Sequence, residues 1–219
     1  METAPFILKE FQPFTLGTKV AQAKLFFKEN TFSHFPIVEN KTLIGLISEI
    51  DLTGIDDNEK KLDDFNYLFK LFFSEESENL LELVRIFASN ETNLIPVVKE
   101  NHSYIGYLDL IDILHVYNET PFLKGEGIVL LLEKELQDFS FSQVCQIVES
   151  NNGKILGLFI SETTGVIVKI TIKFNSQDVN EIIQAFRRYN YNILSKHKED
   201  FFLEDLKERS DYLQKYLNI

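Results

Sequence analysis

The chain has 219 residues, of which 44% are hydrophobic and 26% charged, and it contains one cysteine. This composition is ordinary for a globular protein of one or two domains, and a lone cysteine excludes an intramolecular disulfide. The formal net charge of −12 argues against nucleic acid and against an anionic membrane surface as partners, because both are bound through Lys and Arg. The start of the chain lacks the features of a signal peptide, and no apolar run approaches the ~20 residues that cross a bilayer. We therefore expect a cytoplasmic protein with no membrane partner.

The first half of the chain contains two similar stretches. "HFPIVENKTLIGLISEIDL" begins at residue 34, and "LIPVVKENHSYIGYLDLIDIL" begins at residue 94. Their prolines are 60 residues apart, and the glycines and aspartates that follow are 61 apart. The extra residue falls in a polar turn, where a structural repeat tolerates an insertion. We place repeat 1 at residues 1–62 and repeat 2 at residues 63–119.

Each repeat follows the same order of elements. Apolar residues at helical spacing predict helices over 18–30 and 77–90, the second capped by Ser74 or Ser77. A short strand through the proline, a polar turn and a strand opened by the glycine follow, and a second helix begins near the aspartate. Residues 68–73, "LFKLFF", are read as a strand that enters repeat 2.

A proline and flexible positions at 116–126 indicate a domain boundary. The pattern over 125–198 is βαββαβ, a split βαβ unit with two helices on one face of an antiparallel sheet. Ser140 or Ser142 is expected to cap its first helix and Ser176 its second, and a "TTG" turn joins the two middle strands. Residues 199–219 predict a C-terminal amphipathic helix with an apolar stripe of Phe202, Leu206, Leu213 and Leu217, expected to be a core or dimer contact.

The two repeats resemble a tandem pair of cystathionine-β-synthase (CBS) domains, a Bateman module. "FSHFPIV" is similar to the family's Ser-x-aromatic-Pro-Val strand, and "GLISEIDL" to its Gly-x-x-Thr/Ser-x-x-Asp signature. The resemblance covers residues 10 to 115. The resemblance implies a regulatory module that binds an adenine nucleotide and has no catalytic activity. It also implies a homodimer.

The chemistry of repeat 1 suits a nucleotide. Ser48 and Asp51 are three residues apart, so both reach the same side of a strand-to-helix turn. A carboxylate accepts two hydrogen bonds from a ribose diol, and a hydroxyl with a free helix N-terminus donates to phosphate. Gly45 permits close backbone approach, and an apolar slot for the base is expected from Phe14, Phe35 and Ile37. In the alternative interpretation, Asp51 only caps its helix and Ser48 only satisfies the turn.

Repeat 2 departs from the signature. Asp109 occupies the Thr/Ser position, where an ionised carboxylate repels phosphate. Gly106 and Asp112 remain, so a nucleoside without phosphate stays possible at what we expect to be a degenerate site. No Lys or Arg lies within five residues of Ser48 or Asp109, so a triphosphate needs a cation or a base from elsewhere.

The element order of 125–198 resembles an ACT-type regulatory domain. Many such domains bind an amino acid at a loop that here reads "ELQDFSFSQ"; Asp138 is present, but the family's Pro and Gly are missing. The alternative is a unit that only pairs with a second copy. The histidines 34, 102, 115 and 197 show no metal-ligand spacing, and Cys145 is read as core packing. We predict no metal site and no catalytic residues.

The fold class predicted is α+β, a tandem CBS pair followed by a ferredoxin-like, ACT-like domain and a C-terminal helix. The function predicted is regulatory. The CBS pair senses AMP, ADP, ATP or S-adenosylmethionine, and the ACT-like domain relays or scaffolds the response to a regulated enzyme or another protein. The alternative is a ligand-free dimeric scaffold with degenerate CBS sites.

Overall fold

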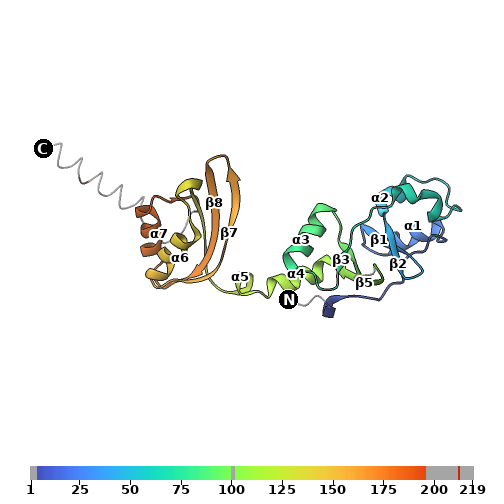
Figure 1. Ribbon diagram of the computed structural model, residues 1–219, viewed down its shortest axis with the longest axis horizontal. Helices are drawn as coiled ribbons and strands as arrows, with labels where there is room; N and C mark the ends of the chain where they lie inside the picture. Colours follow the sequence, from blue (N-terminus) through green and yellow to red (C-terminus); the bar gives the residue numbers. More distant parts are fainter. Residues whose placement is uncertain (1–3, 100–101, 196–211, 213–219) are drawn as a thin grey trace. The chain divides into compact units, whose positions relative to one another are not determined.

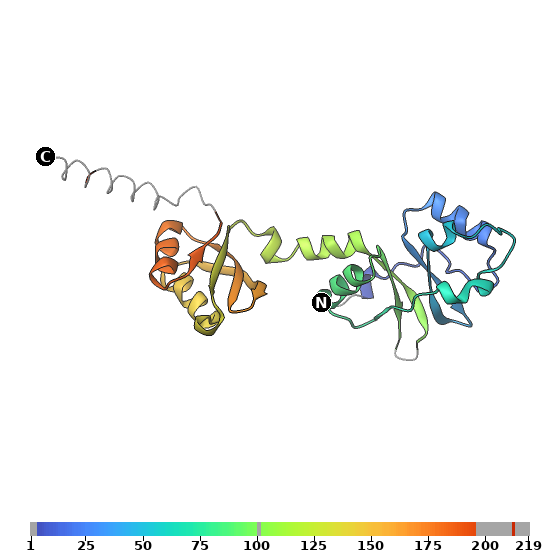
Figure 2. The same ribbon diagram turned by 90° about the horizontal axis from the view of Figure 1, so that it is seen from above.

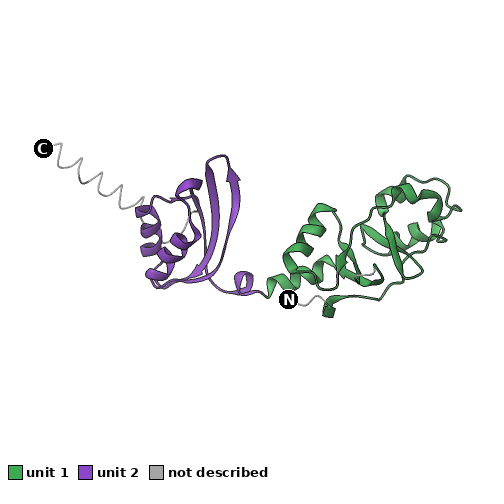
Figure 3. Cartoon of the chain, in the orientation of Figure 1, with its two compact units in different colours: residues 1–119 green, residues 120–219 purple. Residues whose placement is uncertain are grey.

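The computed structural model describes residues 4–99, 102–195 and 212. The chain divides into two compact units, residues 1–119 and 120–219 (Figure 3). Of the helix expected over 199–219, only Tyr212 lies within the described residues, where it is helical and exposed. The remainder of that expectation, with its apolar stripe, lies outside them, as does His197.

The first unit contains the helix–hairpin–helix plan twice, as the repeated sequence predicts (Figures 1 and 2). In each copy the two helices that flank the hairpin pack against each other. The elements are η1 (Ala4–Phe6), α1 (Val20–Glu29), β1 (His34–Glu39), β2 (Thr42–Ser48), α2 (Glu49–Thr53), η2 (Leu62–Leu68), β3 (Ser74–Glu75), α3 (Leu80–Ser89), β4 (Leu94–Val98), β5 (Tyr104–Asp109) and α4 (Leu110–Asn118).

Each hairpin is bordered by a segment from elsewhere in the unit. Lys70 pairs with Leu46 of β2 through two backbone hydrogen bonds of 2.8 and 2.9 Å. In the same way Leu8 pairs with Tyr107 of β5 through bonds of 2.8 and 3.0 Å. The two copies are therefore related by an approximate two-fold arrangement in which residue 70 and residue 8 occupy equivalent positions.

The strand predicted over residues 68–73 is wrong. Only Ser74–Glu75 forms a strand, parallel to β4, while Lys70 makes a single bridge to β2 of the other copy. Residues 70 to 75 thus pair first with copy one, at Lys70, and then with copy two, at Ser74–Glu75, which an apolar run alone does not reveal.

The joint between the copies is made by polar side chains at the start of β1 and β4. The Ser33 N–H donates to Asn93 Oδ1 at 2.9 Å, and the Asn93 N–H donates to Ser33 Oγ at 3.1 Å. Asn93 Nδ2 also donates to the Thr31 carbonyl at 2.6 Å. These reciprocal bonds satisfy backbone groups that would otherwise be buried without partners, and one continuous hydrophobic core spans both copies around them.

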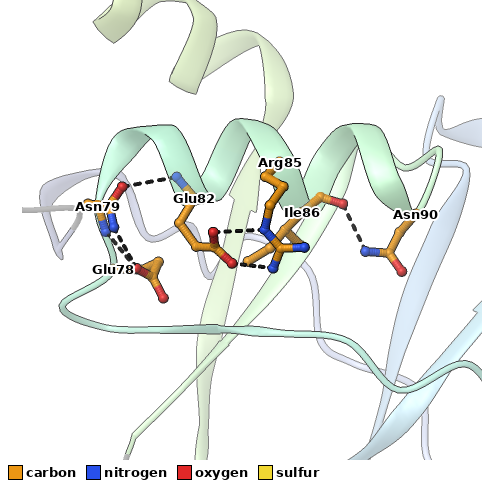
Figure 4. Close-up of polar contacts among 6 residues, drawn as sticks. All are labelled: Glu78, Asn79, Glu82, Arg85, Ile86 and Asn90. Atoms are coloured by element: carbon orange, nitrogen blue, oxygen red, sulfur yellow. Dashed lines mark hydrogen bonds and ion pairs between the residues drawn. The ribbon is translucent and has the colours of Figure 1, made fainter. Parts of the chain in front are cut away.

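Helix α3 is capped differently from the prediction (Figure 4). Asn79 Oδ1 accepts the Glu82 N–H at 3.0 Å, whereas Ser74 is buried in β3 and Ser77 is exposed before the helix. Glu82 and Arg85 form an ion pair one turn apart, and Asn90 Nδ2 donates to the Ile86 carbonyl at the other end. Asparagine caps as well as serine does, so residue preference alone does not decide between these candidates.

The second unit has the predicted βαββαβ order. Its sheet order is β7-β8-β6-β9 with antiparallel neighbours, which is the ferredoxin-like arrangement, and α6 and α7 cover one face (Figure 1). The elements are α5 (Pro121–Lys124), β6 (Ile128–Glu135), η3 (Leu136–Asp138), α6 (Phe141–Ser150), β7 (Lys154–Thr164), β8 (Ile167–Asn175), α7 (Val179–Arg188) and β9 (Asn192–Ile193).

Of the two helix caps predicted in this unit, one is confirmed and one is wrong. Ser140 caps α6 as one of the two predicted candidates, accepting the Gln143 N–H at 3.1 Å. The prediction of Ser176 for α7 is wrong, because Asp178 Oδ1 accepts the Glu181 N–H at 3.0 Å. Ser176 instead accepts the Asp178 N–H at 3.2 Å and so supports the capping residue. Asp178 also places a carboxylate at the positive end of the helix dipole.

Candidate functional site

Ser48 and Asp51 lie together at the turn from β2 to α2. The Ser48 hydroxyl donates to Asp51 Oδ2 at 2.6 Å, and Ser48 Oγ accepts the Asp51 N–H at 3.0 Å. Ser48 is buried and Asp51 is half-buried. Ser48 is therefore the N-cap of α2, and Asp51 is an acidic residue of its first turn. The capping interpretation, which gave the cap to Asp51, named the wrong residue of the two. The arrangement leaves one Asp51 oxygen, Oδ1, with no hydrogen bond to any other described residue, and therefore available to a ligand.

The end of α2 offers few free donors. The Glu49 N–H is bonded to the Ser33 carbonyl at 3.0 Å, and the Asp51 N–H is bonded to Ser48. The helix has only five residues, from Glu49 to Thr53. We expected a free helix N-terminus for phosphate, but two of the first three N–H groups of α2 are already hydrogen-bonded.

The three residues expected to form an apolar slot are part of the core. Phe35 and Ile37 are fully buried, and Phe14 is 8% exposed. The rings of Phe14 and Phe35 lie 5.0 Å apart, and the Phe35 ring lies 4.2 Å from that of Phe26. Aromatic neighbours fill the space that the slot would need, so these side chains line no open slot in this structure.

Gly45 lies beside the segment that crosses its hairpin. A Cβ atom at this position would be 3.1 Å from Cβ of Phe69 and 3.2 Å from the Lys70 carbonyl oxygen. Close backbone approach is thus used, as expected of glycine, but the approaching group is a neighbouring strand segment of the chain.

His34 is a residue that sequence reasoning set aside. It lies opposite Ser48 in the β1–β2 register and is 5% exposed. Its Nδ1 lies 3.1 Å from Ser33 Oγ, whereas the buried Nε2 has no hydrogen-bond partner in the described part of the chain. Burial lowers the pKa of the imidazole, the charge of Lys70 lowers it further, and Asp51 raises it. The alternation of the strand gave no signal for His34, because both faces of β1 are buried.

This lowered pKa predicts a loss of stability in mild acid. Below the ordinary value of 6.5, an unfolded chain takes up a proton on His34, whereas the folded chain does so only below its lower pKa. We expect the free energy of unfolding to fall as the pH drops through this window. Each unit of lowering contributes about 1.4 kcal/mol.

Urea titrations of the wild type and His34→Gln between pH 7.5 and 5 measure this effect. The difference in unfolding free energy between the two proteins should decrease as the pH falls, because the other histidines titrate in both proteins. A difference that stays constant over this range would contradict the burial of a neutral imidazole.

The corresponding turn in copy two is arranged otherwise. Asp109 caps α4, its Oδ1 accepting the Ile111 N–H at 2.7 Å, and Asp112 is half-buried in the first turn. Gly106 has a φ of +147° and lies against Leu8. Asp112 borders a cavity of about 290 Å³ together with Phe6, His115, Val116 and Glu119. The carboxylate of Asp109 is thus placed where copy one has the Ser48 hydroxyl.

In the second unit, the loop singled out by the sequence borders a cavity of about 580 Å³. Its lining includes Asp138 and Glu135 together with Lys134 and Arg188, so charges of both signs meet there. Lys134 Nζ donates to Gln143 Oε1 at 3.0 Å and lies 4.2 Å from the centre of the Tyr191 ring, which ties the loop to the sheet. Burial raises the pKa of Tyr191 to about 12.

Other candidates contribute little. Among the described residues, no group of three or more His, Cys, Asp and Glu side chains is arranged to hold a metal ion. Cys145 is half-buried beside the fully buried Val144 and Val148 of α6. None of the helices within the described residues has the length and apolar character that crossing a membrane requires.

Comparison with known families finds a match in the first half of the chain. The family model of the CBS domain matches residues 7–56 and 71–119. An uncharacterized protein of Methanocaldococcus jannaschii is 30% identical over 121 residues, which is 51% of this chain. The chain spans about half the length (46%) of this curated relative.

Three solved structures illustrate the similarity. A CBS domain pair/ACT domain protein from Thermotoga maritima is 18% identical with a TM-score of 0.49, and the match covers 54% of this chain and 98% of that chain. The CBS domains of a transcriptional regulator from Streptococcus pneumoniae are 16% identical with a TM-score of 0.46, over 52% and 98%. The protein CBSX2, solved in complex with AMP, is 19% identical with a TM-score of 0.46, over 53% and 95%.

Proposed function

The chain carries two CBS domains in tandem, and on this basis we propose that it is a non-catalytic regulatory protein whose first copy binds an adenine nucleotide. CBS pairs are in general regulatory nucleotide-sensing modules. The observation that carries the proposal is the Ser48–Asp51 pair, which the fold holds at the β2–α2 turn. Asp51 Oδ1 is the group that accepts the ribose hydroxyls. The second unit, with its ferredoxin-like sheet, relays or scaffolds the response in a homodimer.

Calorimetric titration with AMP, ADP, ATP and S-adenosylmethionine tests this function. We expect one ligand to bind the wild-type chain at a single site. Asp51→Ala should weaken that binding at least tenfold, because a hydrogen bond to a charged group contributes about 1.5–3 kcal/mol.

Asp112→Ala, the equivalent change in copy two, is the matched control and should leave the affinity within about twofold, inside the ~0.5 kcal/mol expected of a distant site. Circular dichroism checks that both variants fold. Absence of heat with all four ligands at millimolar concentration would contradict nucleotide binding.

A second candidate function is a ligand-free dimeric scaffold. The mutual bond of Ser48 and Asp51 and the complete burial of Phe35 and Ile37 favour it. In that case the acidic first half recruits a basic partner protein. Recovery of one stoichiometric partner that nucleotide does not displace, together with a dimer by light scattering, would distinguish this function from nucleotide sensing.

A further inference from the structure

The first copy needs phosphate donors that its signature does not supply. The Ser48 hydroxyl has one proton, and it is donated to Asp51. Two of the N–H groups at the start of α2 are already bonded. No Lys or Arg lies within five residues of Ser48 in the sequence. A phosphorylated ligand at this turn must therefore find its donors on other elements of the unit.

The fold brings two such groups to Ser48. His34 is the direct cross-strand neighbour of Ser48 in the β1–β2 register. Lys70 is paired with Leu46, two residues before Ser48 on the same strand, so register places it on the face that carries Ser48. The charges of Lys70 and Asp51 both shift the pKa of His34, in opposite directions, which agrees with the proximity that the strand register gives.

Both groups have unused hydrogen-bonding capacity. Nε2 of His34 is buried and lacks a partner within the described residues, and leaving a buried polar atom without a hydrogen bond costs free energy. Lys70 is exposed, and its ammonium is in none of the ion pairs found in the described part of the chain. The Phe72 ring lies edge-on to the imidazole, with the ring centres 5.7 Å apart. Side chains around the imidazole therefore have to move before a ligand can reach Nε2.

The second copy provides an internal comparison. Asp109 replaces Ser48 at the turn, as the signature already shows. The residue opposite Asp109 in the β4–β5 register is Leu94, where copy one has His34. The residue that crosses this hairpin is Leu8, where copy one has Lys70. All three positions that favour an anion in copy one are apolar or acidic in copy two, although the backbone arrangement is the same.

We propose that His34 and Lys70 hold the phosphate of a nucleotide bound in copy one, which makes this copy selective for the phosphorylated nucleotide over its nucleoside. This inference rests on the proposed function and assigns the phosphate-binding residues of the same site. Nε2 of His34 donates one hydrogen bond to a phosphate oxygen, and the Lys70 ammonium supplies a charge-assisted bond. Asp51 and Lys70 are the groups whose charges shift the pKa of His34, and Ser33 and Phe72 are its neutral neighbours.

Calorimetric titrations with AMP and with adenosine at constant pH and ionic strength test the inference. The wild type should bind AMP more tightly than adenosine. His34→Gln and Lys70→Gln should each weaken AMP binding about tenfold or more and leave adenosine binding unchanged, since a bond to a charged group is worth about 1.5–3 kcal/mol.

Lys99→Gln is the matched control, because it removes one positive charge from an exposed position at the far end of β4. It should change AMP affinity by less than about threefold, as expected of a distant exposed charge. If His34→Gln fails to fold, Lys70→Gln decides, since Lys70 is exposed.

The outcomes separate this inference from the proposed function. If Asp51→Ala weakens AMP binding while the His34 and Lys70 variants bind AMP like the wild type, nucleotide binding stands and the phosphate assignment is overturned. Equal wild-type affinity for AMP and adenosine also overturns the assignment. A wild type that binds neither AMP nor adenosine overturns the phosphate assignment, and one that also fails to bind ADP, ATP and S-adenosylmethionine overturns the proposed function as well.

Discussion

Replacing Gly106 with alanine is expected to destabilise the first unit by about 3 kcal/mol or more. Gly106 has a φ of +147°, a conformation that residues with a Cβ rarely adopt, and such backbone strain costs about 1–3 kcal/mol. A Cβ atom there would also lie 2.4 Å from the Leu8 carbonyl oxygen and 2.5 Å from Cγ2 of Ile7. Forcing these segments apart adds an overpacking cost of about 1–3 kcal/mol and breaks the pairing of Leu8 with Tyr107.

Urea unfolding of the full chain, followed by circular dichroism, measures this effect. Gly45→Ala is the matched control, because Gly45 has the same place in copy one but no positive φ. Its Cβ contacts of 3.1 and 3.2 Å are tight rather than impossible, so a smaller loss is expected. Equal losses in the two variants would show that the crossing of residues 7–9 over Gly106 is not what requires glycine there.

The two signature glycines illustrate what a sequence can predict and what it cannot. Their equal positions in the repeats were visible, and the hairpins followed from the alternation of apolar residues around them. The segments that pass over them, at residues 8 and 70, are distant in sequence, and a single bridge leaves no periodic signal. The glycines were therefore assigned to ligand approach, whereas the structure shows them under neighbouring strand segments.

The helix caps were predicted less well than the helices. Amphipathic spacing located α3 and α7, but the caps are Asn79 and Asp178 instead of the serines proposed. Several residues that can cap stand close together before each helix, and they differ little in intrinsic preference. Residue preference therefore does not decide which of them caps, and the sequence around each helix start leaves the choice open.

The candidate site shows the same division. Ser48 and Asp51 could be paired from the sequence, because three residues across a strand-to-helix turn leave little freedom. His34 and Lys70 could not, because one reaches the turn through strand register and the other through the crossing segment. The residues near Ser48 in the sequence therefore include no Lys, Arg or His, whereas the fold brings His34 and Lys70 to it.

Replacing Phe35 with alanine is expected to lower the free energy of unfolding by about 3–5 kcal/mol, the usual cost of removing a fully buried Phe. Phe35 is 0% exposed and contacts the rings of Phe14, Phe26 and Phe32 at 4.2–5.5 Å. Such aromatic pairs add to the loss of buried area, since each is worth about 0.5–1.5 kcal/mol. Tyr67→Ala, at a side chain that is 75% exposed, is the control and should cost less than about 1 kcal/mol.

The size of this loss bears on where a base can lie. A Phe that walls an open slot is partly solvated, so its removal would cost little stability and much affinity. Removal of a Phe from the core lowers the stability, but the protein that remains folded keeps its affinity for the ligand, because the ligand does not contact the ring. Urea unfolding and AMP titration of Phe35→Ala therefore distinguish the two roles. A loss of unfolding free energy below about 1 kcal/mol, the range of exposed positions, would indicate that Phe35 lines the binding site and that the aromatic cluster opens around a ligand.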